Sequence, residues 1–101
     1  MIMEVAELTI RPGDEHAFEK GVAMAAPLFL RAKGCHGLSL QKVIETPNLY
    51  RLRVKWETVE NHMVDFRASD DFQEWRGLVG AYFAAPPMVT HESEAAVFAP
   101  A

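Results

Sequence analysis

The eight residues at positions 49–56, "LYRLRVKW", alternate between two kinds of side chain, and this alternation constrains the fold more than any other feature. Successive residues of a strand point to opposite faces of a sheet, whereas an α-helix repeats about every 3.6 residues. The segment therefore predicts a strand with one face against helices and one cationic face. The cationic face is either solvated or opposed by acidic residues such as Glu7 or Glu92 across a dimer. The inward set is Tyr50, Leu52, Val54 and Trp56, and the outward set is Leu49, Arg51, Arg53 and Lys55.

A strand and a helix are predicted before this segment. The opening residues "MIMEVAELTI" alternate as a strand would, with Glu4 as the one exception on the apolar side. After the Pro12-Gly13 turn, a helix is expected from an N-cap at Asp14 to the region of Gly34. Pro27 predicts a kink in this helix, because proline removes a backbone hydrogen bond and crowds the previous turn. The apolar positions at helical spacing are Phe18, Val22, Ala25 and Phe29.

The remaining segments complete a sheet with helices on one face. Residues 37–44 and 49–56 form a predicted hairpin around Pro47-Asn48, and residues 89–98 form a predicted last strand. Helical segments are expected over about 59–67 and 70–83, with Thr58 and Ser69 as N-caps. This order predicts an α+β fold of the ferredoxin-like split βαβ type, with one four-stranded antiparallel sheet and a single domain over residues 1–101.

Charge and hydropathy exclude several classes of partner. The formal net charge is −4 and the basic residues are scattered, so we expect no nucleic-acid partner. The longest apolar run, residues 22–30, is less than half of the roughly 20 residues that cross a bilayer. The start of the chain lacks the basic residues of a signal peptide, and the lone Cys35 cannot form an internal disulfide. These features predict a cytoplasmic protein with no membrane contact.

The segment over residues 56–76 contains an unusual concentration of aromatic, titratable and cationic groups. His62 lies at the edge of the apolar stripe of its helix and is predicted to be half-buried. Arg76 lies inside the apolar arc of the next helix, about 40° from the direction of Phe72. A buried guanidinium needs an anionic or carbonyl partner. We therefore predict a pocket between sheet and helices, lined by Trp56, Phe66, Trp75, Tyr82 and His91, with His62 and Arg76 as the chemical groups.

Each of these residues also has a purely structural interpretation. Arg76 would equally serve a structural salt bridge, or reach the rim with its charged end. Histidines placed like His62 and His91 more often make structural hydrogen bonds, and tryptophans such as Trp56 and Trp75 more often fill the core. The functional interpretation rests on the convergence of indole, imidazole and guanidinium groups on one space.

No metal or cofactor motif is present in the sequence. The histidines at positions 16, 36, 62 and 91 include no pair with the spacing of metal ligands, and the chain has one cysteine. Neither the glycine pattern of a dinucleotide site nor that of a P-loop occurs. We therefore expect no metal site and no tightly bound cofactor.

Four stretches give the chain a family resemblance: "RPGDEHAFEK", "GCHGLSLQ", a tryptophan followed by "FRASDDFQEWR", and "PPMVTHES". Together they resemble the antibiotic biosynthesis monooxygenase domain of the dimeric α+β barrel superfamily, over residues 2–98. The resemblance implies a homodimer in which two sheets pack face to face, and a pocket for a small-molecule substrate between each sheet and its own helices.

The resemblance also implies which site residues match and which differ. Trp56 and Arg76 match the pocket tryptophan and arginine of members that oxidise phenols to quinones. His62 stands where those enzymes have a tyrosine, Leu52 replaces an asparagine, and Ile44 replaces a histidine. The asparagine, tryptophan and histidine of the haem-degrading branch correspond to Ala6, Phe66 and Arg76, which disfavours haem degradation.

These observations favour a cofactor-independent monooxygenase acting on a phenolic or enolisable small molecule. In this hypothesis His62 takes a proton, Arg76 stabilises the oxyanion, and the aromatic residues hold the substrate. Two alternatives stay open: a dimeric barrel that only binds a small molecule, and an isomerase, lyase or cyclase in which His62 or His91 moves protons.

Overall fold

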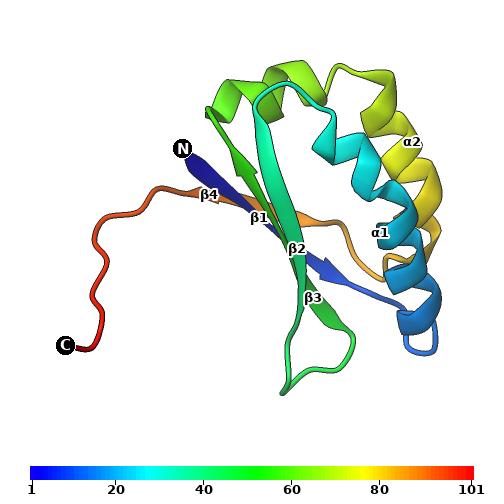
Figure 1. Cartoon of the computed structure of the whole chain (residues 1–101). Helices are drawn as coiled ribbons and strands as arrows, with labels where there is room; N and C mark the ends of the chain where they lie inside the picture. Colours follow the sequence, from blue (N-terminus) through cyan, green and yellow to red (C-terminus); the bar gives the residue numbers. More distant parts are fainter.

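One antiparallel sheet of four strands, covered on one face by helices, forms the body of the protein (Figure 1). A computed structural model describes all residues 1–101. The strand order is β2-β3-β1-β4, so the first and last strands lie side by side. This arrangement confirms the predicted α+β ferredoxin-like fold. In chain order the elements are β1 (Ile2–Thr9), α1 (Glu15–Leu30), β2 (Cys35–Lys42), β3 (Leu49–Trp56), the π-helix η1 (Asn61–Phe66), α2 (Asp70–Val79), the 3₁₀-helix η2 (Gly80–Tyr82) and β4 (Met88–Glu92).

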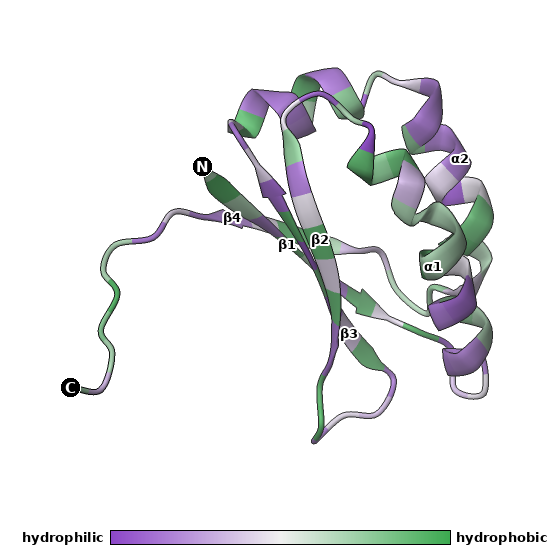
Figure 2. Ribbon diagram, viewed as in Figure 1, coloured by the Kyte–Doolittle hydropathy of each residue, from purple (hydrophilic) through white to green (hydrophobic).

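The alternation of β3 places its side chains as predicted, and Figure 2 shows the same alternation of hydropathy along the strands. Tyr50, Leu52, Val54 and Trp56 are all buried against the helices. On the other face Arg51 lies 3.8 Å from Glu7 of β1, and Arg53 lies 3.7 Å from Glu92 of β4. The acidic partners proposed for a second subunit therefore lie within the same chain, because the register sets Glu7 opposite Arg51 and places β4 next to β1.

The first helix differs from its prediction at both ends. Asp14 occupies the N-cap position, but its side chain makes no capping hydrogen bond; instead the Gly13 N–H donates to the Glu15 carboxylate at 2.9 Å. The helix ends at Leu30 rather than near Gly34, and Pro27 lies in its last turn. In the turn that follows, Gly34 has a φ of +81°, and β2 begins at the next residue, Cys35.

The two helical segments after β3 begin at the predicted caps. The Asn61 N–H donates to Thr58 Oγ1 at 3.1 Å, and Asn61 Oδ1 accepts from the Thr58 N–H at 3.1 Å. The Phe72 N–H donates to Ser69 Oγ at 3.2 Å. The second segment is shorter than predicted as an α-helix, since α2 ends at Val79 and continues as the 3₁₀-helix η2.

The last strand is much shorter than the predicted range of residues 89–98. β4 pairs only with β1, and Glu92 lies opposite Met3 near the start of β1. Beyond Met3 only Met1 and Ile2 remain as possible partners, so β4 could not extend to residue 98 along β1. Residues 93–101 extend away from the body (Figure 1), and Phe98 is 92 % exposed.

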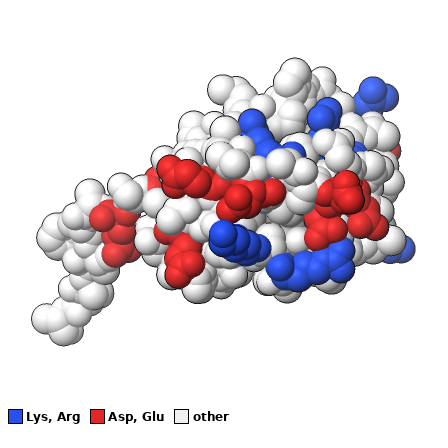
Figure 3. All heavy atoms as spheres, turned by 90° about the horizontal axis from the view of Figure 1, so that it is seen from above, with Lys and Arg blue, Asp and Glu red and all other residues white.

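Two surface properties bear on possible partners. Acidic and basic side chains lie next to one another on the face shown in Figure 3. None of the helices combines the length and the apolar character that crossing a membrane requires.

Candidate functional site

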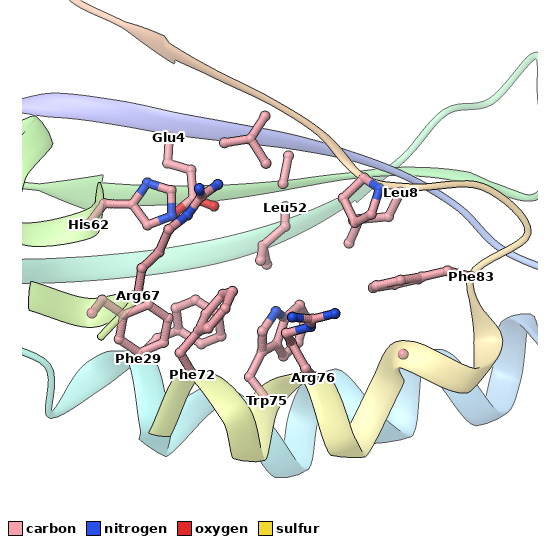
Figure 4. A pocket seen from close by; sticks show the side chains of 15 residues that line it. Glu4, Leu8, Phe29, Leu52, His62, Arg67, Phe72, Trp75, Arg76 and Phe83 are labelled. Atoms are coloured by element: carbon pink, nitrogen blue, oxygen red, sulfur yellow. The ribbon is translucent and has the colours of Figure 1, made fainter. Parts of the chain in front are cut away.

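A cavity of about 450 Å³ lies between the sheet and α2 (Figure 4). Its volume is within the range of about 300–1,000 Å³ typical of small-molecule sites. Four ionisable side chains interrupt the otherwise apolar lining: Glu4, His62, Arg67 and Arg76. The apolar side chains of the lining are Ala6, Leu8, Phe29, Leu52, Phe66, Phe72, Trp75, Phe83 and Val89.

A buried carboxyl group and a buried imidazole meet at one end of this cavity. Glu4 on β1 is 4 % exposed and His62 on η1 is 3 % exposed. The Trp56 indole N–H donates to Glu4 Oε1 at 2.9 Å, and His62 Nε2 lies 3.3 Å from the same oxygen. On the far side of the ring, His62 Nδ1 lies 2.9 Å from Nε2 of His91 on β4. The polar groups of Trp56, Glu4, His62 and His91 therefore form one continuous chain of contacts beside the apolar core.

Burial moves the pKa values of this pair toward their neutral forms. Desolvation raises the pKa of Glu4 to about 7, although the hydrogen bond from Trp56 and the charge of Arg67 act in the opposite direction. Desolvation lowers the pKa of His62 to about 4, and the charges of His91 and Arg67 add to this effect. At neutral pH, His62 is therefore an uncharged imidazole, and Glu4 is poised between its acid and carboxylate forms.

The π-helix η1 explains how His62 reaches this position. A π-helix turns more widely than an α-helix and occurs often at functional sites. In η1 the wide turn buries both His62 and Phe66. The imidazole lies parallel to the Trp56 ring, with centroids 5.6 Å apart and an interplanar angle of 15°. His62 is thus more deeply buried than its predicted place at the edge of the stripe.

The guanidinium of Arg76 lies at the rim rather than inside the apolar arc. Its residue is exposed, and its Cζ lies 6.0 Å from the centroid of the Phe72 ring. The prediction of a buried guanidinium is wrong, because the long side chain carries its charge out to the rim while its stem covers apolar surface. The hollow itself is present where the prediction placed it.

The other predicted site residues divide into two groups. Phe66 and Trp75 line the cavity, together with His62 and Arg76. The remaining three do not line it: Trp56 is completely buried behind Glu4, His91 lies behind His62, and Tyr82 lies beside Gly21 of α1.

Two ionisable lining residues were missing from the sequence-based set. Glu4 left a visible signal, since it is the one charged residue on the apolar side of β1. No sequence signal pointed to Arg67, because it lies in the turn between η1 and α2, where neither the helical nor the strand period applies. No group of three His, Cys, Asp or Glu side chains is arranged to hold a metal ion.

A four-stranded split βαβ sheet with helices on one face places the protein in the class of ferredoxin-like α+β proteins. Within that class, the chain belongs to the antibiotic biosynthesis monooxygenase family, whose sequence pattern matches residues 1–78.

Individual relatives agree with this assignment. YczJ, an uncharacterized protein of Bacillus subtilis, is 40 % identical over 91 residues, which cover 90 % of this chain and 96 % of YczJ. A crystal structure of a Bordetella bronchiseptica protein assigned to the antibiotic biosynthesis monooxygenases superposes with a TM-score of 0.93 at 59 % identity, covering 94 % of this chain and 97 % of that one. SnoaB, a cofactor-independent oxygenase from Streptomyces nogalater, shares the fold with a TM-score of 0.78 at 17 % identity, covering 95 % of this chain and 94 % of SnoaB.

Proposed function

We propose that this protein is a cofactor-independent monooxygenase that oxidises a small phenolic or enolisable molecule in the cavity. The observation that carries the proposal is the buried pair of Glu4 and His62 at the wall of an apolar pocket. A base beside apolar surface suits the abstraction of a proton from a weakly acidic C–H or O–H group. Family membership and the shared fold of the oxygenase SnoaB support the same reaction class.

The pKa values favour Glu4 as the proton acceptor. General bases work best when their pKa is close to the working pH, and the pKa of Glu4 is about 7. With a pKa of about 4, His62 is the weaker base of the two. The role predicted for His62 alone therefore passes to the pair: the carboxylate accepts the proton, and the neutral imidazole holds the carboxylate in place.

The reaction needs no electron source besides the substrate. Loss of a proton leaves a carbanion or phenolate, which gives one electron to dioxygen; the two radicals then combine to a peroxide. Loss of water from the peroxide converts a CH₂ group to C=O, so that one oxygen atom is retained and the other leaves as water. The departing oxygen takes the proton held by Glu4 and the second hydrogen of the CH₂ group, which together complete the water. Arg67, which lies at the end of the cavity that holds Glu4 and His62, stabilises the negative charge on the substrate oxygen during these steps.

We also propose that the protein acts as a homodimer that pairs the outer faces of two sheets. Helices cover only one face of the sheet (Figure 1), and the other face carries Val5 and Leu49 among its ion pairs. The exposed side chains of Val97 and Phe98 in the extended tail would be buried against the second subunit. Light scattering on the full chain tests this: a monomer at micromolar concentration would contradict it.

Oxygen uptake with a panel of phenols, hydroquinones and cyclic 1,3-diketones tests the reaction. For any substrate found, we expect one dioxygen consumed per product and one labelled oxygen atom incorporated from ¹⁸O₂. Glu4→Gln and His62→Gln should each slow turnover at least about 10²-fold. His16→Gln, which removes an exposed imidazole that does not line the pocket, should leave turnover unchanged.

Two outcomes would refute the oxygenase proposal. Product formation at an equal rate under nitrogen would indicate an isomerase or lyase. Tight retention of a ligand with no chemical change would indicate a binding protein.

A further inference from the structure

Two arginines of the cavity have no acidic partner, although the other arginines of the folded body mostly do. Arg31 pairs with Asp71 at 2.7 Å, and Arg51 and Arg53 lie near Glu7 and Glu92. No carboxylate oxygen lies within 4.0 Å of the guanidinium nitrogens of Arg67 or Arg76, both of which line the cavity. Arg67 and Arg76 are exposed and share the lack of a carboxylate partner with other basic residues of the surface, but they are the two cations that line the apolar cavity.

The two guanidinium groups lie at different places along the pocket (Figure 4). Arg67 lies at the end that holds Glu4 and His62, and its charge affects the pKa of both. Arg76 projects from α2 next to Trp75, farther along the cavity. One cation therefore accompanies the acid–base pair, and the second lies over the apolar middle of the pocket.

The rest of the lining restricts the kind of anion that would fit. No Lys, Ser, Thr, Asn or Gln side chain lines the cavity. A phosphate dianion carries more charge than a single guanidinium neutralises, and Glu4 would repel it more than a monoanion. The planar fork of a guanidinium matches a carboxylate through two parallel hydrogen bonds. The aromatic side chains provide surface for a ring system.

We propose that the substrate is an aromatic or conjugated carboxylate. Arg76 binds its carboxylate, the ring lies against Phe72 and Trp75, and the acidic C–H or O–H points toward Glu4 with Arg67 beside the oxygen that becomes negative. This inference rests on the proposed function for the identity of the reacting group, but the binding of the anion is independent of the reaction.

Anaerobic titration with matched probes tests the inference without any turnover. 2-Naphthoate and its neutral methyl ester have the same ring system, and calorimetry with the quenching of tryptophan fluorescence reports their binding. We expect the carboxylate to bind at least about 10-fold more tightly than the ester, and to lose affinity as salt is added.

Two variants locate the binding group. Arg76→Gln should remove most of the preference for the carboxylate over the ester. Arg11→Gln removes the same charge from an exposed turn outside the cavity, and should leave the preference unchanged.

The outcomes separate this inference from the oxygenase proposal. Equal binding of acid and ester, an unchanged preference in Arg76→Gln, or no binding by any one-ring, two-ring or three-ring carboxylate would overturn the inference. Oxygen uptake with neutral substrates alone would overturn it and leave the oxygenase proposal standing. Selective carboxylate binding without oxygen uptake would support it and remove the oxygenase proposal.

Discussion

Replacing Glu4 by glutamine tests the electrostatic state of the buried pair. Glutamine keeps the shape of the side chain and still accepts the Trp56 N–H, but it cannot ionise. The pKa of Glu4 rises on folding from its ordinary value of 4.5 to about 7, mainly through burial. A carboxyl group with a raised pKa contributes stability that is fully present below pH 4.5 and is lost as the pH rises through 7.

The magnitude follows from the difference between the two pKa values. At roughly 1.4 kcal/mol for each pKa unit, the change from 4.5 to about 7 amounts to about 3 kcal/mol. His62 acts in the opposite direction, because its pKa falls from 6.5 to about 4 and its contribution is lost as the pH falls through that range. In the wild-type protein the two slopes cancel between about pH 4.5 and 6.5, since one group releases a proton on unfolding and the other takes one up.

Glu4→Gln removes one of these opposing slopes. Its free energy of unfolding should therefore increase from pH 4.5 to 6.5, where that of the wild type stays level. Relative to the wild type, the variant should gain about 3 kcal/mol between pH 4.5 and 7.5. Urea denaturation followed by tryptophan fluorescence, at one fixed protein concentration, measures this difference at each pH.

The control is Glu45→Gln, which removes an exposed carboxylate from the β2–β3 loop. Its difference from the wild type should stay constant across the same pH range. If Glu4→Gln gives the same flat line to within about 1 kcal/mol, then Glu4 ionises normally in the folded protein, and the argument from burial fails.

Three further substitutions test the parts that hold the site together. Trp56→Phe removes the hydrogen-bond donor that lowers the pKa of the Glu4 carboxyl group, so the rise of activity with pH should move to higher pH. The free energy of unfolding should fall by at least about 1 kcal/mol. A pH–rate profile measures the first effect and urea denaturation the second. Gly34→Ala should lower the free energy of unfolding by more than about 1 kcal/mol and reduce activity in the same assays. The φ of Gly34 is +81°, and a Cβ there would collide with the side chain of Asn61, the first residue of η1. Ser69→Ala should cost about 1 kcal/mol or more of thermal or urea stability, because it removes the cap of α2 and the bond from the Ser69 hydroxyl to the Phe66 carbonyl. It should leave the pH–rate profile in place, since neither bond involves Glu4 or His62.

A matched glycine serves as the control for the second substitution. Gly77 lies inside α2 with open space where a Cβ would be. Gly77→Ala should therefore keep or slightly increase stability, by up to about 1 kcal/mol. A similar loss of stability in both glycine variants would contradict the role given to Gly34.

Features that depend on near neighbours in the chain were predictable. The period of residues 49–56 identified the inward face of β3, and all four of its side chains are buried. The caps at Thr58 and Ser69 were predictable because each bonds a backbone group only three residues away. The length of β4 was not predictable, since it is limited by the partner strand: Glu92 already pairs with Met3, and only two residues of the chain precede Met3.

The site depends on contacts between distant parts of the chain. Glu4 meets His62 because η1 folds over the sheet, and His91 joins them because β4 pairs with β1 in a register that sets His91 opposite Glu4. No local pattern specifies this meeting. The pKa values also follow from it, since only the assembled core excludes water from the carboxyl group and the imidazole.

For Arg76, one property followed from the sequence and another only from the tertiary structure. Its direction on the helix followed from the period of α2, and it lies at the pocket as that direction requires. Its exposure was decided by the length of the side chain and the open rim above Phe72. The sequence by itself determined the periods, the caps and the sheet faces, because these arise within a few residues. The tertiary structure alone decided which ionisable groups share the cavity and how much water reaches them, because strand pairing and helix packing bring both ends of the chain together.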